Sequence, residues 1–134
     1  MKQLFLASIF ICCSVLNTNA QDIKAPDTAS FSKTFDKVEV EASFAGGVSA
    51  WRNYLTRKLD ANVPVKNDAP IGQYQVIVIF IVGKDGTISD IRPLTKHGYG
   101  MEQEVIKIIK SGPKWEPAMQ DGRPVNAYRK QPVT

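Results

Sequence analysis

The feature that most constrains the fold is an unbroken apolar run, VIVIFIV, at residues 76–82 of the 134-residue chain. β-Branched and aromatic residues favour a strand, and Gly72 and Gly83 bound the run, so we predict a strand over residues 73–82. Side chains of a strand alternate between two faces, and here both faces are apolar. We therefore expect helices on one face, and the N-terminal leader or a partner on the other.

A second strand is predicted directly after this run. Residues 83–86 (GKDG) have the composition of a hairpin turn, so residues 87–95 should form the antiparallel partner. Pro93 lies within that stretch. Because proline cannot donate a hydrogen bond to a sheet, it places the outer part of this strand at an edge or a bulge.

Two amphipathic helices are predicted, one on each side of the hairpin. The first covers residues 48–61 and should end at Asn62 and Pro64. Its apolar face is formed by Val48, Trp51, Leu55 and Leu59, with Tyr54 beside them. The second covers residues 101–110 and should stop at the Gly-Pro pair that follows. Its apolar stripe is formed by Met101, Val105, Ile108 and Ile109.

Strand-like segments also stand at both ends of the folded region. Residues 38–42 alternate apolar and charged side chains, which is typical of a short edge strand. Residues 114–118 should be an extended link, Asp121 and Gly122 a turn, and residues 124–133 the last strand. The order (β)αββαβ predicts the α+β class, as a two-layer sandwich of a small antiparallel sheet with two helices on one face.

The N-terminal residues have the layout of a secretory signal. A positive charge at Lys2 precedes an apolar stretch over residues 4–16 and small residues before position 21. We predict a signal peptide over residues 1–20, with an uncleaved membrane anchor as the alternative. A flexible leader over residues 21–37 and one domain over residues 38–134 should follow. Both cysteines of the chain lie in the apolar stretch, so cleavage would leave a domain without thiols.

The sequence offers little that points to catalysis or metal binding. His97 is the only histidine, and the chain contains neither a phosphate-binding glycine motif nor a serine nucleophile elbow. We expect no enzymatic activity, no cofactor and no metal. An active site would need a polar cleft around His97, Asp85 or Glu116. We expect Glu102 and Glu104 to be solvated or to favour the N-terminus of their helix.

Positive charge gathers in the C-terminal part of the chain. Residues 92–134 contain eight basic and four acidic residues, whereas residues 21–91 contain eight and nine. The last strand holds the sequence Tyr-Arg-Lys at residues 128–130. Basic residues and proline can protect an edge strand from unwanted pairing. The same edge could instead dock an extended segment of a partner, and the residues leave both interpretations open. The charge surplus alone does not indicate nucleic acid.

Several short motifs follow one another in a characteristic order. The strand and its KDG turn are followed by GPKWEPA at residues 112–118, DGRPV at 121–125 and YRKQPV at 128–133. This succession resembles the TonB C-terminal domain family, in the form common in Bacteroidetes-type bacteria. The resemblance covers residues 38–134.

The resemblance implies a periplasmic protein of the Gram-negative envelope that acts in energy-coupled transport, such as siderophore uptake. Its partner would be the TonB box, an extended peptide of outer-membrane receptors, bound by strand addition. ExbB and ExbD would be further partners if the chain is anchored in the inner membrane. The implied partner-binding residues are Val125, Asn126, Ala127, Tyr128, Arg129, Lys130, Gln131, Pro132 and Val133. The alternative is an interaction module that forms a homodimer or contacts another envelope protein without transducing energy.

Overall fold

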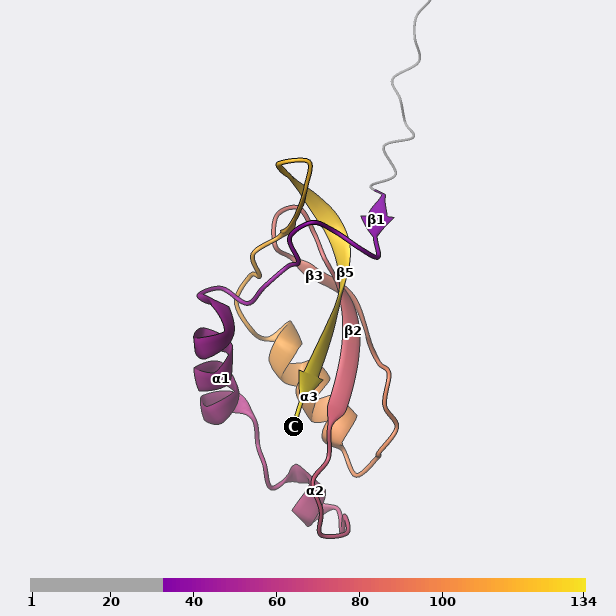
Figure 1. Cartoon of the computed structure of the whole chain (residues 1–134). Coiled ribbons are helices and arrows are strands. Elements are labelled where there is room, and N and C mark those ends of the chain that lie inside the picture. The colour runs from indigo at the N-terminus through magenta and orange to yellow at the C-terminus, as the bar shows by residue number, and fades with distance from the viewer. Residues whose placement is uncertain (1–32) are drawn as a thin grey trace, which may run out of the picture.

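The computed structural model describes residues 33–134 of the chain (Figure 1). The predicted signal peptide and most of the predicted leader lie outside the described residues. In chain order the elements are β1 (Thr34–Phe35), α1 (Gly47–Lys58), α2 (Val63–Lys66), β2 (Val76–Val82), β3 (Ile88–Pro93), α3 (Met101–Lys110), β4 (Ala118–Gln120) and β5 (Arg123–Val133). They form a small α+β sandwich, as predicted, in which helices cover an open sheet.

The strands lie in the order β1-β5-β2-β3, and β4 pairs with β5 off this path. β2 is antiparallel to both of its neighbours, and its pairing with β5 runs from Val76↔Val133 to Val82↔Ala127. β1 is the exception to the predicted antiparallel sheet, because it pairs with β5 in parallel. Its residues, Thr34 and Phe35, were expected in the leader; they join the sheet instead, at the level of Asn126 and Ala127 of β5.

The core lies between one face of the sheet and the helices α1 and α3 (Figure 1). The even-numbered side chains of β2 point into this layer, and Val78, Phe80 and Val82 are completely buried. The Tyr54 hydroxyl of α1 donates a hydrogen bond of 2.7 Å to the backbone carbonyl of Ile108 in α3, which ties the two helices together. Both helices therefore cover the same face, as predicted.

Trp115, in the segment predicted as an extended link, belongs to this core. Only 4% of its surface is exposed, and its ring lies 5.0 Å from the ring of Phe80, between centroids. Phe44 and Trp51 contact it from the α1 side at 5.7 and 5.6 Å. Buried aromatic rings in such tilted contacts attract one another beyond the gain from burial. Trp115 thus joins the helix layer to the sheet.

The first predicted helix was too long, and one residue of its predicted apolar face, Val48, is exposed. α1 ends at Lys58, and Pro64, expected to terminate it, instead stands in the first turn of the separate helix α2. Proline is tolerated there because the first N–H groups of a helix have no partner within it. Val48 is 68% exposed, whereas Trp51 and Tyr54 are buried and Leu55 and Leu59 pack against the core, as predicted.

α3 has the predicted bounds, but its two acidic side chains are not solvated. Glu102 is 5% exposed and accepts two backbone N–H groups of the preceding loop, at 2.6 and 3.1 Å. Glu104 is 7% exposed, accepts the backbone N–H of Asp60 at 3.2 Å and pairs with Lys107. These partners make the burial of a carboxylate tolerable. Both residues do lie in the first turn, where the helix dipole favours negative charge.

The opposite face of the sheet is only partly covered by the described residues. Ile77, Ile79 and Ile81 of β2 point to it and are half-buried, in contrast to the buried residues between them. The expectation that the leader or a partner covers this face stays a prediction.

Candidate functional site

All nine residues predicted to bind a partner lie in β5. Ala127, Gln131 and Val133 are buried on the side of the helices, whereas Lys130 and Pro132 are exposed. The remaining four, Val125, Asn126, Tyr128 and Arg129, are half-buried. The strand therefore buries one face while its other face and its edge remain accessible.

The two edges of β5 differ in how completely they are paired. One edge is covered by β2 from Ala127 to Val133. The first part of the strand also pairs with β4, at residues 123–125, and with β1, at residues 126–127. Beyond β1, no strand among residues 33–134 pairs with the outer side of residues 128–133. We call this stretch the free edge.

The hydrogen bonds of Ile77 establish which backbone groups point to the free edge. Its N–H donates to the hydroxyl of Thr95 at 3.2 Å, and its carbonyl accepts the N–H of Leu94 at 2.8 Å. Ile77 therefore directs its backbone groups away from β5, although it stands opposite Pro132. Backbone direction alternates along an antiparallel pair. Pro132 and Lys130 thus direct their backbone groups outward, and Pro132 has no N–H to offer.

The two basic residues of the free edge have different surroundings. Arg129 faces the helix side opposite Phe80, and its guanidinium pairs with the carboxylate of Glu41. Its Nε is buried and has no hydrogen-bond partner among the described residues. Lys130 is exposed on the other face. The accessible positive charge at this edge therefore comes from Lys130.

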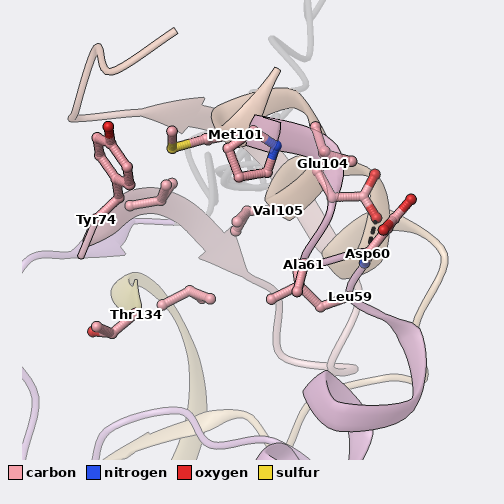
Figure 2. A pocket seen from close by; sticks show the side chains of 12 residues that line it. Leu59, Asp60, Ala61, Tyr74, Met101, Glu104, Val105 and Thr134 are labelled. Carbon is pink, nitrogen blue, oxygen red and sulfur yellow. Dashed lines mark hydrogen bonds between the residues drawn. The ribbon is translucent and has the colours of Figure 1, made fainter. Parts of the chain in front are cut away.

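A pocket of about 180 Å³ lies where β5 ends (Figure 2). Leu59 and Ala61, which follow α1, stand across from the end of β5 at Thr134, with Val105 of α3 between them. The complete lining consists of Leu59, Asp60, Ala61, Val63, Pro64, Tyr74, Val76, Met101, Glu104, Val105, Val133 and Thr134. Most of these side chains are apolar, so the pocket can receive an apolar group.

Two carboxylates stand at this pocket, and both already have partners. Asp60 accepts hydrogen bonds from the ammonium of Lys66 at 2.8 Å and from the backbone N–H of Asn62 at 2.9 Å. These two bonds hold the pKa of Asp60 below its ordinary value. Glu104 is bound by Lys107 and by the backbone of Asp60. Asp60 is therefore suited to remain charged at neutral pH.

The residues considered for catalysis are each held by local partners. The Nε2 atom of His97 lies 2.8 Å from the carbonyl of Gln75. The carboxylate of Asp85 accepts the hydroxyl of Thr87 at 2.6 Å and its backbone N–H at 3.1 Å, which lowers the pKa of Asp85. Glu116 accepts the hydroxyl of Ser43 at 3.3 Å. Within residues 33–134, no cluster of three or more His, Cys, Asp or Glu side chains is arranged to hold a metal.

Comparison with known proteins assigns the part of the chain that contains the free edge. Residues 73–134, which include β2, β3, α3, β4 and β5, match the family described as Gram-negative bacterial TonB protein C-terminal. This part of the chain belongs to the TonB C-terminal family. TonB C-terminal domains are interaction modules that contact outer-membrane receptors. Searches of curated proteins and of solved structures found no match.

The TonB C-terminal segment contributes seven of the twelve residues that line the pocket. The other five precede residue 73: Leu59 and Ala61 were predicted to lie in the last turn of the first helix, and α2 was not predicted. Leu59 and Val63, two apolar residues close to Pro64, are the sequence signal that could have indicated one wall of this pocket. The described helices include none that is long and apolar enough to cross a membrane.

Proposed function

We propose that this TonB C-terminal domain binds an extended segment of an outer-membrane receptor, a TonB box, by strand addition to the free edge. The binding would serve energy-coupled transport across the outer membrane. The domain would act in the periplasm, delivered there by the predicted signal peptide or held by an inner-membrane anchor. The observation that carries the proposal is the stretch 128–133, whose outer backbone groups no described strand uses.

The geometry of the free edge supports strand addition over binding by side chains alone. Lys130 presents both its N–H and its carbonyl to the outside, and hydrogen bonds between main chains provide the affinity in this mode of recognition. An unpaired, regular edge is also a template for any extended chain. Pro132 limits such pairing because it has no N–H. The free edge thus favours a short partner in a defined register.

Titration with synthetic TonB-box peptides should displace the amide signals of the free edge. With the ¹⁵N-labelled domain, we expect the largest shift at Lys130, since its N–H would gain a hydrogen bond. Amides of Asp85 and Thr87, in the β2–β3 turn, serve as the internal reference and should stay in place. Shifts spread evenly over the domain, or none at all, would contradict strand addition.

Replacing Lys130 with proline tests the backbone contact directly. The Lys130 N–H points away from β2, so K130P should leave the sheet intact, with a change in unfolding free energy within about 1 kcal/mol. Peptide affinity should fall at least ~10-fold, because the edge loses a donor and gains a bulky ring. K130A keeps the N–H and removes the charge, so it should bind more tightly than K130P. Equal affinities for the two variants would refute a main-chain contact.

Self-association through the same edge is the competing outcome of these experiments. If the free edge serves a second copy of the chain, sedimentation should show a dimer that K130P dissociates and that peptides do not displace. A monomer whose peptide binding is independent of protein concentration would support the receptor interpretation instead.

A further inference from the structure

We infer that the pocket at the end of β5 receives one large apolar side chain of the segment that pairs with the free edge, and that this contact determines which segments bind. The inference rests on the proposed strand addition. It adds a site that lies on the helix side of the sheet and is built partly by Leu59, Ala61 and Val63, which precede the family match.

The position of the pocket follows from the pleat of the sheet. Val133 lines the pocket and is also the last residue of β5, so the free edge leads directly to it. Every second side chain of an added strand points to the same face as Ala127, Gln131 and Val133, which is the face of the helices. One of these side chains would stand beside Val133 and face the space in front of Val105. In strand addition, such pockets for alternate side chains provide specificity.

The size and lining of the pocket define the class of side chain. A volume of about 180 Å³ exceeds the roughly 150 Å³ cavity that is known to hold benzene. It therefore has room for one leucine, isoleucine or phenylalanine side chain. The walls that such a group would touch include Leu59, Val63, Met101 and Val105. Burying an apolar group there removes its surface from water, which is the main source of affinity in a site of this kind.

The pocket also disfavours acidic side chains. Asp60 and Glu104 both line it, and the hydrogen bonds that lower the pKa of Asp60 keep its carboxylate charged. Because Lys66 and Lys107 already pair with these carboxylates, an acidic side chain brought to this pocket would be buried among apolar walls without a cationic partner. Specificity then comes from the attraction of the apolar wall and from the cost of burying a charge without a partner. We expect the preference Leu over Ala over Asp at the one peptide position that faces the pocket.

An alanine scan of a TonB-box peptide against two variants of the full chain tests the inference. A61F places a ring on the exposed wall of the pocket, and V65F adds the same ring at an exposed residue of α2 outside the lining. With the unmodified protein, one apolar peptide position should lose ~10-fold or more in affinity on change to alanine. A61F should bind the original peptide about 10-fold more weakly and be insensitive to that change, whereas V65F should behave like the unmodified protein.

The outcomes separate this inference from the function on which it rests. If the peptide shifts the Lys130 amide but A61F binds it as well as V65F does, the pocket is not the contact and strand addition survives. If no peptide shifts Lys130, both proposals fail. Methyl signals of Val105 and Met101 provide a second readout: they should move with a leucine peptide and stay still with its alanine counterpart. Equal midpoints of thermal unfolding for A61F and V65F would verify that both variants are folded.

Discussion

Replacing Phe80 with alanine is expected to cost about 3–5 kcal/mol of unfolding free energy, a large part of the total for a domain of this size. The ring is completely buried at the centre of β2 and contacts Trp115. F80A would therefore lose the burial of the ring and would leave a cavity whose walls have lost their contacts with it. Urea unfolding followed by tryptophan fluorescence measures the effect, because Trp115 reports on the same core.

The neighbouring residue Ile79 provides the matched control for Phe80. It lies on the opposite, partly covered face of β2 and is only half-buried. I79A should cost less than half as much as F80A, since less apolar surface is removed from contact. Equal losses would mean that the face carrying Ile79 is as well covered as the core, which would contradict the alternation described for β2.

Replacing Gly86 with alanine is expected to destabilise the domain by about 3 kcal/mol or more. Gly86 ends the β2–β3 turn with φ of 81°, a conformation that costs any other residue energy. A Cβ atom there would lie 2.1 Å from the backbone carbonyl oxygen of Trp115. The N–H of Trp115 in turn donates to the carbonyl of Gly86 at 2.9 Å, so the two segments cannot separate without losing that bond.

Gly122 distinguishes the clash at Gly86 from the cost of its backbone angle. It has a similar φ of 71°, in the turn between β4 and β5, but a Cβ atom there would meet nothing within 4 Å. G122A should therefore lose only about 1 kcal/mol, from the backbone conformation alone. Thermal unfolding of the two variants measures the difference. If both lost equal stability, close packing between the turn and Trp115 would be ruled out.

The sequence predicted well those parts of the fold that a local pattern determines. The apolar run of β2, the glycine turn after it and the periodicity of α3 each depend on neighbouring residues alone. By contrast, Pro64 was interpreted as a helix terminator, although proline also suits the first turn of a helix, and sequence alone does not distinguish the two.

The parts that were not predicted depend on residues far apart in the chain. β1 has two residues and forms only because Asn126 and Ala127 offer an edge more than ninety positions later. Glu104 is buried because the backbone of Asp60 supplies a donor. The pocket needs Leu59, Val105 and Val133 at once. For the site, the sequence indicated the correct strand, but which half of it is unpaired required the register of β1 and β4.

The parallel pairing of β1 with β5 has a mechanical consequence for a domain that would transmit force. The described chain enters at β1, beside Asn126, and the free edge is the following stretch of the same strand. A pull between the entering chain and a docked segment would run along β5 and load its pairing with β1 and with the docked segment, which lie on the same edge of the strand. Seven residue pairs join the opposite edge of β5 to β2 and would hold the strand in the sheet under that load. The helices would lie beside the line of tension, so the core could stay closed while the sheet is under strain.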